Sequence, residues 1–197
     1  MIYYNIMIYG RNIWGPKAWH LLHIFSINNH LKIPNSKKHN YFIFYNSFIY
    51  LIPCLICSEH YANIINNIYP LIEEKINRKY LIKWVYNTHN IVNEIIHKPK
   101  YSYKKFIEYN IEINHNDIFF IIYSIYSEID YNMISLYKYD QIYNFFINFC
   151  LLYPEKNRKR NLKKIIKNES FTKLITPREF NIWFKDNIKI IKEIICE

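Results

Sequence analysis

Residues 77–99 read NRKYLIKWVYNTHNIVNEIIHKP, and this stretch is the clearest helical signal in the chain. Asn is a preferred residue at a helix N-cap, because its side-chain oxygen accepts a free backbone N–H of the first turn. Lys98-Pro99 closes the stretch, since proline cannot continue a helix and restricts the residue before it. We therefore predict a helix over residues 78–97 with Asn77 as its cap.

Three further helices are predicted upstream. Trp14-Gly15-Pro16 opens a segment with apolar and aromatic residues spaced by three and four, and Pro16 suits its first turn. Pro34 ends that segment, and we expect Ser36 to cap the next helix. The remaining two helices are predicted from their flanking prolines over residues 37–51 and 54–68. Four helices with short connections predict a helix bundle.

The second half also reads as helical. Residues 141–153 form a continuous apolar run, and Thr176-Pro177-Arg178-Glu179 is a capping box that opens a helix through Ile195. No internal repeat and no Gly/Ser/Pro linker separates the halves. A shift in charge near residue 105 divides the chain into predicted units of residues 1–105 and 106–197.

Composition limits the class of protein. Hydrophobic residues make up 51% of the 197 positions and charged residues 21%, which supports a packed core and excludes wholesale disorder. The net charge of +10 invites an anionic partner. Most of it lies in residues 1–105, where 13 Lys and Arg stand against 4 Asp and Glu. Residues 155–167, EKNRKRNLKKIIK, are densely basic, and we favour a solvated helix face for them over a binding stripe.

Membrane insertion and secretion are not expected. Residues 39–58 lack Lys, Arg, Asp and Glu, but Asn40, Asn46 and Pro53 interrupt them, so a buried helix is favoured over a membrane span. The first residues have neither a basic start nor a small-residue cleavage site, so no signal peptide is predicted.

Cys54-Leu55-Ile56-Cys57 follows a proline at a predicted helix start. Free N–H groups and the positive end of the helix dipole stabilise a thiolate there. Taken alone, this spacing fits a redox pair, half of a zinc site that includes His60, or two buried small residues. A structural zinc site needs four ligands, which the other cysteines do not supply, so no metal is expected. A thioredoxin-like motif would need a βαβ context that these flanks lack.

Two other motifs bear on this choice. The first, W-G-P-x-x-W-x-x-L-H, spans residues 14–23 and places Trp19 and His23 on one helix face. The second, W-x4-H-N-x-V-N-x4-K-P-x-Y, spans residues 84–101 and pairs His89 with Asn93 in the same way. Aromatic rings, His and Asn hydrogen-bonding groups and a nearby lysine suit a planar cofactor with a diphosphate tail.

The order and spacing of the three motifs resemble those of the Erv/ALR family of flavin-linked sulfhydryl oxidases. The resemblance covers about residues 13–103, and every motif position is filled. It implies an all-α fold, a four-helix bundle with a short fifth helix that binds FAD and forms a homodimer. Residues 106–197 are then a mainly helical C-terminal extension that the motifs do not cover.

The resemblance also implies roles for individual residues. Cys57 would be the flavin-proximal cysteine and Cys54 the one that exchanges with substrate. His60, one turn further along, is expected either to line the flavin site or to be structural. The implied FAD-binding residues are Gly15, Trp19, His23, Trp84, His89, Asn90, Asn93, Lys98 and Tyr101.

The implied function is oxidation of protein dithiols to disulfides with reduction of O2 to hydrogen peroxide. The chain looks most like members from large DNA viruses, which implies disulfide formation in the host cytoplasm or the virion during assembly. The mitochondrial intermembrane space is the cellular alternative. The expected partner is a protein dithiol, with a thioredoxin-like carrier as one candidate. The competing hypothesis, from the net charge, is a basic helical module that binds nucleic acid or an anionic surface.

The two remaining cysteines depart from the family pattern. Many members carry a second cysteine pair that acts as a shuttle, and no such pair is recognisable here. Cys150 and Cys196 could bridge each other, pair between subunits or remain free, and we favour free thiols. Without a shuttle pair, substrate thiols are expected to reach Cys54 directly. Trp14 is expected in the core, and the remaining histidines are expected at the surface or at helix caps: His20, His30, His39, His97 and His115.

Overall fold

A computed structural model describes residues 11–29, 32–109, 112–128, 134–174 and 176–197. Within these ranges the regular elements are all helical, which confirms the predicted all-α class. The first half holds α1 (Arg11–Ile27), α2 (Asn35–Ser47), α3 (Leu55–Asn63), α4 (Arg78–Ile95) and the short α5 (Tyr103–Tyr109). Single turns link them: η2 (Phe48–Leu51), η3 (Ile64–Ile68) and η4 (Glu73–Lys75).

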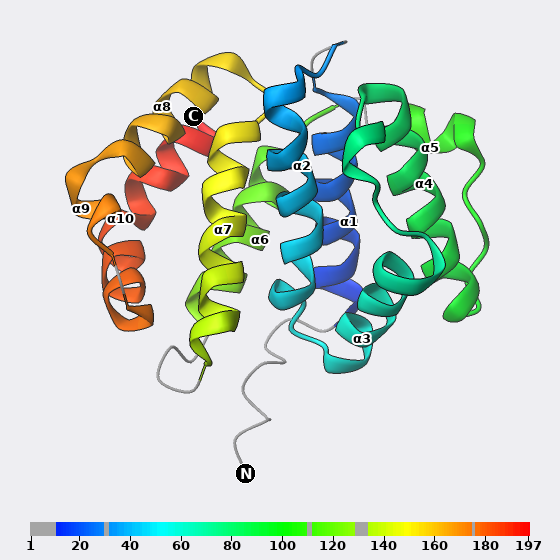
Figure 1. The fold of residues 1–197 in the computed structure, drawn as a ribbon, viewed down its shortest axis with the longest axis horizontal. Coiled ribbons are helices and arrows are strands. Elements are labelled where there is room, and N and C mark those ends of the chain that lie inside the picture. The colour runs from blue at the N-terminus through cyan, green and yellow to red at the C-terminus, as the bar shows by residue number, and fades with distance from the viewer. Residues whose placement is uncertain (1–10, 30–31, 110–111, 129–133, 175) are drawn as a thin grey trace.

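The second half forms a helical extension, as expected. It consists of α6 (His115–Glu128), α7 (Leu136–Leu152), α8 (Lys156–Lys167), α9 (Glu169–Thr172) and α10 (Pro177–Cys196). Figure 1 shows α7 alongside α2, with α8, α9 and α10 on the side away from α4 and α5. Helix α1 contacts both α4 and α6, so it lies between the two halves.

Local capping signals set several helix ends. Asn77 Oδ1 accepts the N–H of Tyr80 at 3.0 Å, which confirms the predicted cap of α4. Thr176 and Glu179 form the predicted reciprocal capping box of α10. The end of α4 comes earlier than predicted, at Ile95, because His97 adopts a left-handed φ of 56° that breaks the helix.

Two predicted helix starts were wrong. Helix α1 begins at Arg11, so Pro16 lies inside it and not in its first turn. Burial of Trp14 and Ala18 offsets the backbone hydrogen bond that the proline lacks. Helix α2 begins at Asn35 with Pro34 as its N-cap, so Ser36 is not the cap. The α-helical part of α2 ends at Ser47, and the uncharged segment 39–58 is therefore divided among α2, η2 and α3.

Both halves contribute to one apolar core. Phe44 of α2 stacks on Phe25 of α1 at 4.6 Å between ring centroids and on Phe145 of α7 at 4.8 Å. Phe149 of α7 also stacks on Phe25, at 5.5 Å. The predicted division at residue 105 therefore falls between segments that share a core.

Two other expectations concern surfaces. Leu162 and Ile166 of α8 are buried while several lysines of this helix are exposed, which fits the favoured solvated basic face. None of the helices in the described ranges combines the length and the apolarity that a membrane crossing requires. The predictions for residues 1–10 and for His30 lie outside the described residues.

Replacing Phe145 by Ala tests the shared core. We expect the free energy of unfolding to fall by about 3 to 5 kcal/mol, because a buried aromatic side chain is removed from between α2 and α7. Urea unfolding followed by circular dichroism measures this change. A single transition with a lower midpoint is expected. Two separate transitions, with only one of them shifted, would mean that the halves unfold independently.

Candidate functional site

The N-terminus of α3 carries a disulfide bond between Cys54 and Cys57, with their Cα atoms 5.2 Å apart. Cys54 is the N-cap residue, and its Sγ accepts the backbone N–H of Cys57 at 3.3 Å. Both cysteines are partly exposed. Of the interpretations left open by the sequence, this geometry is that of a redox pair, placed where a helix N-terminus stabilises a thiolate after reduction.

Helix α3 attaches the disulfide to two neighbouring elements. One turn after Cys57, the Tyr61 ring meets the Trp19 ring of α1 edge-on at 6.4 Å. Directly after Cys57, the Ser58 hydroxyl donates to the Ile49 carbonyl of η2 at 2.9 Å. The start of α3 that carries the disulfide is thus held against α1 and η2.

Helices α1 and α4 face each other through an aromatic cluster made of Trp19, His23, His89, Tyr101 and Phe106. The Trp19 indole stacks on the His89 imidazole with centroids 4.1 Å apart and planes 9° apart. His89 Nδ1 lies 3.0 Å from His23 Nε2. One of these two nitrogens must carry the hydrogen and the other must accept it. The remaining ring contacts join His89 to Tyr101 at 5.1 Å and His23 to Phe106 at 4.6 Å.

Burial keeps His89 neutral. Desolvation of the ring, and secondly the positive charge of Lys98, lower the pKa of His89 from 6.5 to about 4. Lys98 is exposed, so its ammonium group places positive charge at the rim of the cluster. At neutral pH, His89 therefore offers one hydrogen-bond donor, one acceptor and an aromatic face.

The segment after α4 is held in place by Asn90. Its Nδ2 donates to the Tyr101 carbonyl at 3.2 Å, and its Oδ1 accepts the Tyr101 N–H at 2.8 Å. The neighbouring Asn93 is buried, and its backbone carbonyl accepts the N–H of Lys98 at 2.7 Å. Within the described part of the chain, Asn93 Nδ2 has no hydrogen-bond partner. A buried amide donor of this kind indicates a missing acceptor.

The other predicted site residues lie at different depths. Trp84 is deeply buried, and its indole N–H donates to the Tyr69 carbonyl at 3.0 Å. Gly15 is partly exposed, and a Cβ added to it would meet no atom of the described residues within 4 Å. His60 is partly exposed on α3, one turn beyond the disulfide. These placements are described for the protein alone, so the predicted cofactor-binding roles stay predictions.

Comparison with known proteins agrees with the resemblance seen in the sequence. Residues 16–111, which contain the disulfide and the aromatic cluster, match the Erv1/Alr family. This segment belongs to the Erv1/Alr family. It includes every predicted site residue except Gly15, which directly precedes it.

Two curated relatives match the Erv1/Alr segment. A probable FAD-linked sulfhydryl oxidase of Acanthamoeba polyphaga mimivirus is 33% identical over 96 residues, which cover 48% of this chain and 66% of that protein. The mitochondrial FAD-linked sulfhydryl oxidase of Saccharomyces cerevisiae is 29% identical over 88 residues, which cover 45% of each. The chain spans less than two thirds of the length of these relatives. No solved structure gives a significant match.

Phe106 is a member of the aromatic cluster that sequence reasoning missed. It is buried on α5, just beyond the predicted boundary at residue 105, and contacts both His23 and Tyr86. The nearby aromatic residues Tyr101 and Tyr103 were the sequence signal that could have indicated Phe106. Only the turn into α5 brings this ring back onto the Erv1/Alr segment.

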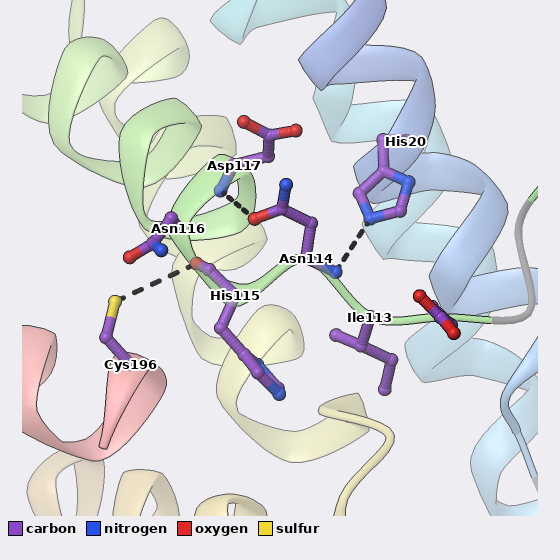
Figure 2. Close-up of a pocket in the computed structure, with 8 residues that line it drawn as sticks. His20, Ile113, Asn114, His115, Asn116, Asp117 and Cys196 are labelled. Carbon is purple, nitrogen blue, oxygen red and sulfur yellow. Dashed lines mark hydrogen bonds between the residues drawn. The ribbon is translucent and has the colours of Figure 1, made fainter.

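A hollow of about 520 Å³ is lined by α1, by the start of α6 and by the end of α10. His20 lines it and is buried, so its predicted position at the surface was wrong. Figure 2 shows His20 Nε2 accepting the Asn114 N–H, and Cys196 Sγ directed at the His115 carbonyl. His115 also contacts the Tyr153 hydroxyl at 2.8 Å and Glu155 at 3.3 Å. Contacts at this hollow thus connect the start of α6 to α1 through His20 and to α10 through Cys196.

The remaining singled-out residues occupy structural positions. Trp14 is buried against Phe48, as expected for a core residue. His39 is exposed beside Glu73, and His97 is exposed after α4. Cys150 and Cys196 are free thiols, as favoured, and burial raises the pKa of the Cys150 thiol well above its usual range.

The depressed pKa of His89 predicts a pH dependence of stability. An unfolded chain binds a proton on this residue below pH 6.5, whereas the folded protein resists it until about pH 4. Stability is therefore lost as the pH falls through this window, by up to about 3 kcal/mol. Urea unfolding of the wild type and of His89→Gln at pH 7 and pH 4.5 measures the contribution. We expect a smaller loss in the variant. The exposed control His39→Gln should behave as the wild type; an equal loss in all three proteins would contradict the assignment.

Proposed function

We propose that the chain is an FAD-linked sulfhydryl oxidase that converts protein dithiols to disulfides and passes the electrons to O2, forming hydrogen peroxide. The observation that carries this proposal is the disulfide at the start of α3, one turn before Tyr61, whose ring meets Trp19 of the aromatic cluster. The names of both curated relatives support the same activity.

The residues of the aromatic cluster fit FAD. Trp19 and His89 offer aromatic faces, and the unpaired Nδ2 of Asn93 is a buried donor that a ring carbonyl or nitrogen would satisfy. Gly15 leaves open space beside α1, and Lys98 supplies a cation for a diphosphate. The residues proposed to hold FAD are those named from the sequence: Gly15, Trp19, His23, His60, Trp84, His89, Asn90, Asn93, Lys98 and Tyr101. When bound, FAD would supply the two-electron acceptor that the cysteines lack.

The chemistry on this chain begins with thiol–disulfide exchange. A substrate thiolate attacks Cys54 Sγ, a substrate–Cys54 bond forms, and the Cys54–Cys57 bond breaks with Cys57 leaving as a thiolate. The second substrate thiolate then attacks the substrate sulfur of the mixed disulfide, and Cys54 leaves as a thiolate. The substrate dithiol has lost two electrons and the cysteine pair has gained them. The N-terminus of α3 stabilises both anions.

Cys57 is assigned the cofactor-facing role that the family resemblance implies for the second cysteine of the pair. In support, Cys57 lies one helical turn before Tyr61, whose ring meets Trp19, whereas Cys54 is the N-cap residue at the start of the helix. No histidine is needed as a general base, since substrate thiols ionise in solution and the helix terminus stabilises the leaving thiolates.

The biological setting we propose is disulfide formation during virion assembly, in the host cytoplasm or the virion, by a homodimer that accepts a protein dithiol or a thioredoxin-like carrier. Similarity to the mimivirus protein supports the viral setting. The cellular alternative is the mitochondrial intermembrane space, and the yeast relative is named as a mitochondrial protein.

Replacing Cys57 by Ser tests the activity directly. The purified wild type should be yellow, with a flavin absorbance band, and should consume O2 when dithiothreitol is added. Cys57→Ser should reduce this uptake to background, because the disulfide cannot form. Cys196→Ser, which removes a partly exposed thiol outside the site, is the matched control and should keep the rate. A colourless wild type that binds DNA with a steep salt dependence would favour the nucleic-acid alternative and overturn the proposal.

Gly15→Ala separates cofactor binding from folding. Alanine favours a helix over glycine by about 0.5 to 1 kcal/mol, and none of the residues that the structure describes obstructs its Cβ, so flavin-free protein should become more stable. FAD binding should weaken, because the methyl group would occupy the space proposed for the cofactor. Thermal unfolding of the flavin-free protein and FAD titration measure the two effects. Unchanged FAD affinity would remove Gly15 from the proposed site.

A further inference from the structure

The four most exposed large apolar side chains in the described part of the chain lie at the starts of two helices. They are Leu136 and Tyr137 at the start of α7, 69% and 62% exposed, and Leu55 and Ile56 between the two cysteines, 66% and 63% exposed. Isolated apolar residues are common on protein surfaces, but a contiguous group marks an interaction site.

Two contacts on η2 bring these helix starts together. The Tyr50 and Tyr137 hydroxyls are 3.1 Å apart, and their rings meet edge-on at 5.6 Å. On the other side of η2, Ser58 of α3 donates to the Ile49 carbonyl. Figure 1 places the start of α3 and the start of α7 at the same end of the molecule. We call Tyr50, Leu55, Ile56, Leu136 and Tyr137 the η2 surface.

The η2 surface adjoins the disulfide. Leu55 and Ile56 lie between Cys54 and Cys57 in the sequence, and Ser58 directly after Cys57 is bonded to η2. A polypeptide lying across the η2 surface would therefore bring its thiol close to the disulfide, where the exchange step begins at Cys54.

Charge indicates what kind of polypeptide fits. Although the chain carries a net charge of +10, residues 40–58 contain no Asp, Glu, Lys or Arg. The exposed charged residues that follow these segments in the sequence have both signs: Glu59, Lys138 and Asp140. The surface itself is therefore uncharged and has no excess of positive charge at its border, which favours an uncharged, apolar segment over an anionic one. The two tyrosine hydroxyls can in addition hydrogen-bond a peptide backbone.

We propose that the η2 surface docks the apolar residues that flank a cysteine pair in a reduced polypeptide, and that the second half of the chain contributes to substrate choice through Leu136 and Tyr137. The proposal rests on the proposed oxidase function for its chemistry. Docking holds the substrate thiolate beside Cys54 Sγ for the exchange described above, and no additional oxidant is involved.

Kinetics with matched peptides test the docking. One peptide carries Cys-Gly-Ser-Cys flanked by Leu and Phe, a second carries the same cysteines flanked by Glu and Ser, and dithiothreitol is the reference thiol. For the wild type we expect a KM for the apolar peptide at least about tenfold below that for the charged one. In Leu136→Ser/Tyr137→Ser, the ratio of the apolar-peptide KM to the dithiothreitol KM should rise about tenfold. The control Ile182→Ser/Ile190→Ser changes two exposed residues of α10 and should keep the wild-type ratio.

A binding measurement separates this proposal from the proposed function. A fluorescent apolar peptide with both cysteines replaced by Ser cannot react, and its anisotropy reports docking alone. If the wild type binds this peptide but does not oxidise dithiothreitol, the docking surface is supported and the proposed oxidase activity is refuted. Equal affinity of the wild type and Leu136→Ser/Tyr137→Ser for this peptide would overturn the docking surface. A wild-type dimer that dissociates in this variant, measured by sedimentation, would also overturn it and assign the η2 surface to a second copy of the chain.

Discussion

Helix α1 is buried on every side along residues 20–27, and this constraint connects the fold to the site. A helix that is apolar all round needs neighbours on all its faces. Helix α4 covers the face with Trp19 and His23, while α6 covers the opposite face, with the Lys17–Asp117 ion pair joining the two helices. The C-terminal half therefore covers a helix that carries cofactor-binding candidates.

Burial also determines the electrostatics of the aromatic cluster. Charged groups are costly to bury, and the buried polar groups here are accordingly neutral: the His89 ring of the cluster, with its depressed pKa, and the nearby amides of Asn90 and Asn93. The positive charge of Lys98 stays at the rim. This division of neutral groups inside and a cation outside suits a ligand with an aromatic ring system and a charged tail.

Helix α3 connects two parts of the structure. Its Tyr61 meets Trp19 of the aromatic cluster, and its Ser58 is bonded to η2, which also contacts the start of α7. The disulfide at the start of α3 therefore lies close to both. The three-residue spacing places the two cysteines next to each other at the helix start, which allows the bond.

The sequence by itself determined the features that depend on neighbours along the chain. Asn77 and Thr176 cap their helices through hydrogen bonds to residues three positions later, and the Cys54–Cys57 spacing permits a disulfide within one turn. Contacts between distant segments were decided only by the tertiary structure. Phe106 reaches His23 through the turn into α5, His20 is buried by α6, and Tyr137 meets Tyr50 because α7 packs on α2. Such contacts depend on how apolar helix faces find one another, which local residue patterns do not specify.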